Sequence, residues 1–282
     1  MESPPGHELL DAGDGRRLER FGPRIVDRPA PGALMPRRDR RAWSGAHLRF
    51  DRDSGWAGSV DPGAPWEMEL DGLRLELRAT PSGQVGLFPE HIGELSWLAT
   101  AVRAGPDPGL PVLNLFAHTG LVTLALARVG GRVAHVDASR PAVAWARRNA
   151  TSSGLGHAPV RWLVEDAERF VARELRRGAR YAGVVLDPPS WGHARGARTW
   201  RLAQRLEALV EAVAALTDRR GFCLLTAHTT GLEPTLLADL LAAAFQRPPG
   251  GVELAPLRLS ARSGASLDLG WRARLRATSL AG

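Results

Sequence analysis

Residues 112–120 read VLNLFAHTG, a run of apolar residues that ends in a short polar turn. The apolar part, Val112–Ala117, predicts a buried strand, and Gly120–Val129 directly after it predicts a helix. A buried strand that leads at once into a helix is typical of the parallel sheets of α/β proteins. This stretch therefore predicts where a strand–helix succession begins.

The same alternation continues downstream. Further strands are predicted at Arg132–Asp137, Val160–Glu165, Ala182–Asp187 and Phe222–His228, each followed by a helix. The runs Gly251–Ser260 and Ser266–Ala277 have no helix between them and predict an antiparallel hairpin that closes the sheet. We expect an α/β fold, a doubly wound, mostly parallel, seven-stranded Rossmann-like sheet with helices on both faces.

The chain upstream of this succession has a different character. Residues 1–36 predict an irregular arm with one short strand near Arg24–Asp27, and His47–Phe50 predicts another strand. Trp66–Ala79 alternates apolar and charged residues around Asp71-Gly72, which is a strong hairpin signal. We expect a small β-rich module over residues 1–80, with a possible role in RNA contact, and a ligand-binding α/β domain over residues 81–282.

Composition excludes several classes of protein. The 282 residues are 44% hydrophobic and 24% charged, which is typical of a globular enzyme. No apolar run approaches the roughly 18 residues of a membrane span, and the acidic N-terminus is unlike a secretory signal. One cysteine excludes a disulfide scaffold and a cysteine-ligated zinc site, and no metal-binding motif such as HExxH is present. We expect a cytoplasmic protein without a metal.

Positive charge is concentrated in one part of the chain. All 37 basic residues are arginines, and residues 192–282 hold 12 of them against 7 acids. Such an excess indicates a polyanionic partner, nucleic acid first, although an ordinary solvated surface is the alternative. The arginines that could contact phosphate include Arg201 and Arg205 on one helix face, and Arg272, Arg274 and Arg276 on one strand face.

Acidic residues follow three successive strands. Asp137, Asp166 and Asp187 stand at the carboxyl ends, where open α/β sheets bind their ligands. The first turn has one glycine rather than GxGxxG, which argues against NAD or FAD, and three carboxylates would repel a pyrophosphate. A ligand with ribose hydroxyls, an amine, an ammonium and a sulfonium would suit them, and S-adenosylmethionine is such a ligand.

Each group has a predicted partner on that ligand. The backbone at His118–Gly120 would pass close to the methionine part, and Asp137 would accept both ribose hydroxyls. Asp166 would accept from the adenine amino group, while the Ala167 N–H would donate to a ring nitrogen. The alternative for each aspartate is a helix cap.

Residues 187–191 read DPPSW and close the apolar strand Gly183–Leu186. Two prolines fix the backbone and remove two donors, so the turn offers acceptors. The Asp187 carboxylate and the Pro188 carbonyl could accept hydrogen bonds from a planar base, on which Trp191 could stack. His193 and His228 could serve as a base or be structural. The candidate catalytic residues are Asp187, Pro188, Pro189, Ser190 and Trp191, and a plain turn is the alternative.

With these residues assembled, the chain resembles class I S-adenosylmethionine-dependent methyltransferases. It is most similar to the family of bacterial 23S ribosomal RNA methyltransferases that modify cytosine carbon 5 or guanine N7, in a short-module branch. The motifs that carry the resemblance are VLNLFAHTG at 112–120, HVDAS at 135–139 with WARRN at 145–149, VVLDPPSW at 184–191 and GLFPEH at 86–91. His118 and His91 depart from the aromatic residue and the glutamine usual in that family.

The resemblance implies S-adenosylmethionine as cofactor and RNA as partner. The cofactor-binding residues then expected are Phe88, Glu90, Asn114, Phe116, His118, Thr119, Gly120, Asp137, Ala138, Asn149, Asp166, Ala167 and Asp187. Cytosine carbon-5 enzymes need a cysteine nucleophile. Cys223, about four residues before the end of its strand, is expected in the core instead. A cysteine-dependent route is therefore not expected.

Two kinds of acceptor remain on an RNA base. A ring nitrogen such as guanine N7 needs positioning alone, whereas an exocyclic amine needs acceptors that draw electron density to nitrogen. Either base would have to be unstacked into the pocket.

The alternatives are a methyltransferase acting on a small molecule or protein side chain, and an RNA-binding module with a vestigial pocket. The acceptor atom and the oligomeric state stay open.

Overall fold

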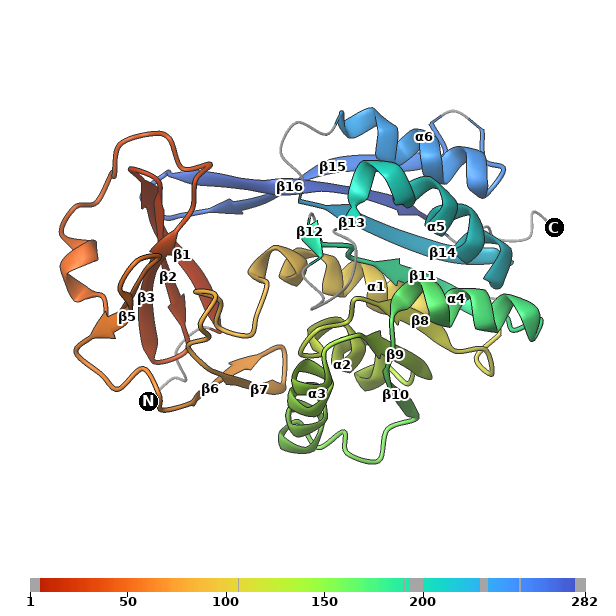
Figure 1. Cartoon of the computed structure of the whole chain (residues 1–282), viewed down its shortest axis with the longest axis horizontal. Helices are drawn as coiled ribbons and strands as arrows, with labels where there is room; N and C mark the ends of the chain where they lie inside the picture. Colours follow the sequence, from red (N-terminus) through yellow and green to blue (C-terminus); the bar gives the residue numbers. More distant parts are fainter. Residues whose placement is uncertain are drawn as a thin grey trace. The chain divides into compact units, whose positions relative to one another are not determined.

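The computed structural model describes residues 6–105, 107–189, 191–192, 200–228, 233–248 and 250–276. The chain divides into two compact units, and each unit is assembled from separate stretches of sequence (Figure 1). The N-terminal unit comprises Met1–Ile92, Arg148–Gly156 and Arg258–Leu269. The α/β unit comprises Gly93–Arg147, His157–Leu257 and Gly270–Gly282.

A five-stranded sheet is the centre of the N-terminal unit. Its strands lie in the order of the sequence, and all pair antiparallel except β3 with β4, which are parallel. The strands are β1 (His7–Gly13), β2 (Arg16–Phe21), β3 (Arg24–Pro29), β4 (Leu48–Asp51) and β5 (Gly55–Gly58), with a 3₁₀ helix at Ala42–Gly45. The predicted hairpin is a separate pair, β6 (Trp66–Leu70) and β7 (Leu73–Leu77), turning at Asp71 and Gly72 with φ of 47° and 71°.

The expectation of an irregular arm at the N-terminus was wrong. The first described residues form β1, β2 and β3, and the first turn is at Asp14-Gly15, where both residues have positive φ. Charged residues are buried inside these strands, among them Glu19 and Arg28. Because buried charges interrupt the apolar alternation, these segments lack the alternating hydrophobicity from which strands are predicted.

Asp11 joins distant parts of the N-terminal unit. Its buried carboxylate accepts hydrogen bonds from the backbone N–H of Arg38 and Asp39, both at 3.0 Å, and from Nε1 of Trp43 at 2.9 Å. The Ser263 hydroxyl, on the turn of the C-terminal hairpin, donates to the other oxygen at 2.9 Å. Burial opposes ionisation, but these hydrogen bonds, led by that of Trp43, lower the pKa of Asp11. One carboxylate therefore fixes the basic segment around Arg38 and the hairpin turn together.

Two stretches from later in the chain complete this unit. Ala265 and Leu267 of the C-terminal hairpin pack against Leu9 and Ala12 of β1. At the other end of the unit, the Ser153 hydroxyl donates to the carbonyl of Arg74 in β7 at 3.0 Å. The unit is thus held together by side chains that are far apart in the sequence.

The α/β unit is built on a seven-stranded sheet of order β10-β9-β8-β11-β14-β16-β15. Its strands are β8 (Val112–Leu115), β9 (Val133–Asp137), β10 (Val160–Val164), β11 (Tyr181–Leu186), β14 (Thr217–Ala227), β15 (Val252–Ser260) and β16 (Ser266–Leu275). The first five in that order pair in parallel, and β16 runs antiparallel to β14. The predicted doubly wound sheet is confirmed.

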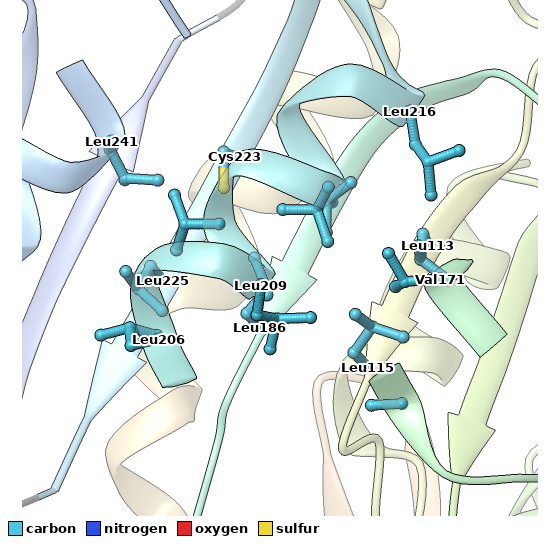
Figure 2. Close-up of a cluster of buried hydrophobic side chains, with 14 of the residues drawn as sticks. Leu113, Leu115, Val171, Leu186, Leu206, Leu209, Leu216, Cys223, Leu225 and Leu241 are labelled. Atoms are coloured by element: carbon cyan, nitrogen blue, oxygen red, sulfur yellow. The ribbon is translucent and has the colours of Figure 1, made fainter. Parts of the chain in front are cut away.

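Helices cover both faces of this sheet (Figure 1). They are α1 (Leu95–Arg103), which follows a 3₁₀ helix at Pro89–Glu94, then α2 (Leu121–Arg128), α3 (Arg140–Ser152), α4 (Ala167–Arg176), α5 (Leu202–Leu216) and α6 (Pro234–Ala244). Leu113 and Leu115 of β8 belong to a core cluster that also holds side chains of α4, α5 and α6, and Leu113 lies beside Val171 of α4 in Figure 2. Val112 belongs to a second cluster with side chains of α1 and α2. Alternate residues of a strand therefore enter different cores, as a sheet buried on both sides requires. None of the described helices is long and apolar enough to cross a membrane.

Candidate active site

Four parallel strands end at one edge of the α/β sheet. Leu115 of β8 pairs with Val136 of β9 and Leu186 of β11, while Val164 of β10 pairs with Asp137. Because these pairs are the last or next-to-last residues of their strands, the turns that follow all start at the same edge. The predicted groups after β8, β9, β10 and β11 are thus brought together.

The turn after β8 has an unusual backbone. Phe116, His118 and Gly120 have positive φ values of 58°, 48° and 92°. A Cβ atom at Gly120 would lie 2.9 Å from Cβ of Ala146, closer than side-chain carbons approach each other. Only glycine fits between this turn and α3, so the backbone at Gly120 packs directly against Ala146.

Asp137 fixes this turn from the end of β9. Its Oδ2 accepts a hydrogen bond from the backbone N–H of His118 at 2.8 Å, and its Oδ1 accepts one from Ser139 at 2.8 Å. The carboxylate is half-buried, and Ala138 beside it is exposed. Each carboxylate oxygen can accept more than one hydrogen bond, so Asp137 keeps the capacity to accept hydroxyl donors while it holds the backbone.

A buried polar chain supports the turn from below. Nδ2 of Asn114 donates to the Thr123 hydroxyl at 2.9 Å, and that hydroxyl is 2.9 Å from Nδ1 of His135. Burial, with a smaller contribution from the charge of His118, lowers the pKa of His135 to about 3, so its ring is neutral at physiological pH. Asn114 was predicted at the cofactor; its amide is engaged inside the unit. Thr123 and His135 were missed, although each is a polar residue in an otherwise apolar segment.

At the end of β10, two acids have defined partners. Asp166 is the N-cap of α4, and its side chain accepts from the backbone N–H of Arg169 at 3.0 Å. Its second oxygen accepts no hydrogen bond within the described part of the chain. Ala167 is buried in the first turn of α4, and the neighbouring Glu165 holds Arg173 at 2.5 Å. Asp166 thus has the cap role that the sequence analysis gave as the alternative, and the residue as a whole is exposed.

Asp187 is held by two side chains of the neighbouring strand end. Its Oδ1 accepts from the Thr226 hydroxyl at 2.5 Å and lies 2.8 Å from Nε2 of His228. Both Asp187 and His228 remain about one-fifth exposed, with side-chain accessibilities of 22% and 24%. The sequence analysis named His228 as one of two histidines that could serve as a base, and it did not identify Thr226. Thr226 and His228 are brought to Asp187 by the pairing of β11 with β14, which the sequence does not reveal.

The other predicted residues of this turn have different places. Pro188 is buried and Pro189 exposed. Trp191 begins the two-residue strand β12 (Trp191–Gly192), which pairs antiparallel with β13 (Trp200–Arg201). Ser190 and His193 lie outside the described residues.

Three predicted cofactor residues belong to the N-terminal unit. Phe88 is half-buried and Glu90 buried there. Asn149 is also buried, and its Oδ1 accepts from the backbone N–H of Glu76 at 2.9 Å. Asn149 therefore joins the end of α3 to β7, a structural role that the sequence did not indicate.

Cys223 lies in the middle of a core cluster. It is fully buried among leucines of the helices and strands, with Leu209 and Leu225 nearby in Figure 2. Burial raises the pKa of its thiol. A buried, protonated thiol has neither the access nor the charge of a nucleophile, as the sequence analysis expected.

The arginines predicted to contact phosphate are largely paired. Arg272 and Arg274 form ion pairs with the buried Glu94 at 3.0 and 2.7 Å, and both also reach Glu253. Arg205 pairs with Glu168 on α4. Arg276 is the most exposed of the described arginines in this prediction, with 71% of its side chain accessible and Glu253 3.8 Å away.

Comparison with known proteins supports the same class. No protein-family model matches the chain. The crystal structure of a S-adenosylmethionine-dependent methyltransferase from Agrobacterium tumefaciens is 32% identical, aligns with 98% of this chain and 92% of its own, and has a TM-score of 0.89. Ribosomal RNA large subunit methyltransferase I from Pseudoalteromonas translucida is 26% identical over 184 residues. A 23S rRNA (uracil(1939)-C(5))-methyltransferase from Methylococcus capsulatus is 39% identical over 87 residues.

The sheet order and the acids after successive strands define a class I S-adenosylmethionine-dependent methyltransferase. The chain belongs to the family of the Agrobacterium enzyme, which it covers nearly in full. S-adenosylmethionine is accordingly its cofactor. The chain spans only 45% and 19% of the length of the two curated relatives.

Proposed function

We propose that this protein methylates a nitrogen atom of a ribosomal RNA base. The observation that carries the proposal is the end of β11, where Asp187 is held by Thr226 and His228 beside the predicted cofactor groups. The curated relatives, named as large-subunit ribosomal RNA methyltransferases, support RNA as the substrate. A cytoplasmic location is part of the proposal.

The α/β unit has groups that fit S-adenosylmethionine. The backbone of the turn at His118–Gly120 would pass close to the methionine part, with Phe116 beside it. Asp137 and Ala138 would hold the ribose, because the fixed carboxylate accepts hydroxyl donors. When bound, the cofactor supplies an electrophilic methyl group on a positively charged sulfur.

The remaining cofactor residues follow from the same assignment. The second oxygen of the exposed Asp166 would accept from the adenine amino group, and the N–H of Ala167 would donate to the ring. Phe88, Glu90 and Asn149 are proposed from the family resemblance alone.

The acceptor side is built from fixed hydrogen-bond acceptors. Asp187 and the carbonyl of Pro188 would accept N–H donors from a base, and Pro188 and Pro189 keep the turn rigid. An exocyclic amine must lose a proton on methylation, and the pair of His228 and Asp187 can take it. A ring nitrogen would need only the positioning.

Carbon 5 of a pyrimidine is not the proposed acceptor. That chemistry needs a thiolate to add to the ring, and Cys223 is buried and protonated. Exposed arginines of the N-terminal unit, Arg38, Arg40 and Arg41, are suitably placed on its surface for contact with an RNA strand.

The test is a transfer assay with tritiated cofactor. Undermodified 23S and 16S ribosomal RNA, transfer RNA and a protein pool are offered separately, and labelled RNA is digested to nucleosides. We expect label in ribosomal RNA, on a nitrogen, and a fall of about 100-fold or more for Asp187→Asn. The matched control is Asp218→Asn, which removes a carboxylate elsewhere in the α/β unit.

The outcomes separate the alternatives. Label in protein or in a small-molecule extract alone would show a different acceptor and end the RNA proposal. Label on carbon 5 would contradict the nitrogen assignment. If His228→Ala lowers kcat with an unchanged KM, the acceptor is an amine that must lose a proton.

A further inference from the structure

The N-terminal unit contains a cavity of about 510 Å³ that the proposed reaction does not use. Its wall comes from β2 and β3, from the segment after β4, from residues 81–84 and from the C-terminal hairpin at 267–269. All of these stretches belong to the N-terminal unit. A volume of this size is in the range of small-ligand sites and would hold a nucleotide-sized group.

The charges on the wall are mainly positive. Arg17, Arg28 and Arg52 line the cavity, and Asp268 is the acid among the lining residues. That carboxylate is already engaged by Arg258 through two hydrogen bonds, at 2.5 and 3.1 Å. The cavity therefore presents an excess of guanidinium groups to whatever enters it.

Two of these guanidiniums are buried and incompletely hydrogen-bonded. Arg17 is 7% exposed and Arg28 is 1% exposed. Nε of Arg28 donates to Glu19 at 2.6 Å and Nη1 donates to Gln84 at 2.6 Å, but Nη2 has no acceptor among the described residues. Nε and Nη1 of Arg17 likewise donate no hydrogen bond within the described chain. Buried donors are normally satisfied, so unsatisfied donors on two residues that line the cavity point to a missing acceptor.

The acids near these arginines do not remove the need for one. Glu19 is fully buried and lies 3.2 Å from Nε of Arg17, without hydrogen-bond geometry. Burial opposes its ionisation, but the charges of Arg17 and Arg28 outweigh that effect and lower the pKa of Glu19. Burial lowers the pKa of Arg17, and the charge of Glu90 opposes that shift. None of the three nitrogens donates a hydrogen bond to either carboxylate.

We infer that this cavity binds a phosphate group of the RNA substrate strand. Guanidinium groups donate in a planar fork that matches phosphate oxygens, and Arg52 at the exposed rim can guide the anion inward. The inference rests on the proposed function for the identity of the strand, and it gives the N-terminal unit a role in holding that strand.

The experiment measures RNA binding directly, without methyl transfer. A fluorescent single-stranded RNA of twelve nucleotides is titrated with full-length wild type and with the variants Arg52→Ala and Arg28→Lys, at several salt concentrations. Arg74→Ala is the matched control, because Arg74 is an exposed arginine of the same unit outside the cavity. Cofactor affinity and the thermal midpoint of each variant report on folding.

The expected result is at least fivefold weaker RNA binding for both cavity variants. The slope of log K against log salt should fall by about 0.7 for each lost phosphate contact. Arg74→Ala should match wild type. Arg28→Lys keeps the charge, so a loss in this variant, with normal cofactor affinity, identifies the fork rather than the net charge.

Three outcomes would overturn the inference. The cavity variants could bind RNA as wild type does, wild type could bind no RNA, or adenosine 5′-monophosphate could occupy the cavity without competing with RNA. The two proposals also fail separately. If RNA is methylated but the variants bind normally, the cavity inference alone is wrong. If the variants lose RNA binding but no ribosomal RNA is ever methylated, the proposed function alone is wrong.

Discussion

The carboxylate of Asp137 and the backbone N–H of His118 lie 2.8 Å apart, joining the end of β9 to the turn after β8. The same carboxylate caps Ser139 through its other oxygen. One side chain therefore fixes the backbone proposed for the methionine part of the cofactor and also offers the acceptors proposed for its ribose. Loss of Asp137 should affect both parts of the site.

Asp137→Asn is expected to weaken S-adenosylmethionine binding by about tenfold or more, because a charge-assisted hydrogen bond contributes roughly 1.5–3 kcal/mol. The amide has one acceptor oxygen and cannot hold both backbone N–H groups and the ribose. Isothermal titration measures the affinity. Asp71→Asn, which removes a carboxylate from the hairpin turn, is the control. An affinity within twofold of wild type would exclude Asp137 from the cofactor site.

Gly120→Ala should lower both stability and cofactor affinity. The methyl group would be strained at φ of 92° and would collide with Ala146, where Cβ atoms would be 2.9 Å apart. Gly130→Ala is a matched control, since Gly130 has φ of 87° but open space around its Cβ. Backbone strain alone costs about 1 kcal/mol. We expect a larger loss at Gly120, measured by urea unfolding, and equal losses would argue against the close packing.

The buried His135 should make stability depend on pH. Its folded pKa of about 3 lies below the ordinary histidine pKa of 6.5, so the unfolded state binds more protons between these values. The contribution is present above pH 6.5 and is lost as pH falls. His135→Gln should remove about 2 kcal/mol of the pH 7 to pH 5 change in unfolding free energy. The exposed His157→Gln should leave the dependence as in wild type, and identical profiles for all three proteins would contradict the prediction.

Glu94 should be a strong contributor to stability. It is buried against Arg272 and Arg274, and Arg274 also lies over the ring of Trp97 at 5.1 Å. Glu94→Gln leaves these cations with Glu253 alone, which should cost about 3 kcal/mol. The midpoint of urea unfolding measures the loss.

The control for Glu94 is an exposed ion pair of the other unit. Glu69→Gln removes the nearer of the two acidic partners of Arg74, and the side chains of Glu69 and Arg74 are both more than half exposed. Its cost should stay below about 1 kcal/mol. A similar midpoint for the two variants would mean that the buried network contributes no more than a surface pair.

Cys223→Ala should destabilise the core modestly and leave methyl transfer intact. The thiol is fully buried among aliphatic side chains, so its removal creates a small cavity, at a cost of about 1–2 kcal/mol. The transfer rate per folded molecule, measured with tritiated cofactor, should stay within about twofold of wild type. A loss comparable to that of Asp187→Asn would show that the cysteine acts in the reaction.

Much of the α/β unit could be predicted from its sequence, because each strand is an apolar run bounded by turn residues. The succession of strands and helices and the closing hairpin follow from that pattern, whereas the order of the strands within the sheet was not predicted. The strands of β1 and β2 could not be predicted in the same way. Their buried charged residues, such as Asp11 and Glu19, form hydrogen bonds with side chains from other parts of the chain. No local sequence pattern predicts such partners.

Part of the candidate site could likewise be predicted from the sequence, and part of it depends on contacts between distant elements. Asp137, Asp166 and Asp187 stand at or just after the ends of strands, so their common edge could be inferred from the sequence. Thr226 and His228 meet Asp187 only through the pairing of β11 with β14. The polar chain beneath the first turn was hidden for the same reason, since it crosses between elements.

The interleaving of the two units has a practical consequence. The N-terminal unit needs the hairpin turn, whose Ala265 and Leu267 cover Leu9, and that turn is encoded near the other end of the chain. A gene fragment that stops after Ile92 would lack this cover, and the complementary fragment would carry an uncovered apolar hairpin. Neither piece should be recoverable by separate expression, so the smallest portable version of this enzyme is the continuous polypeptide that holds all three stretches.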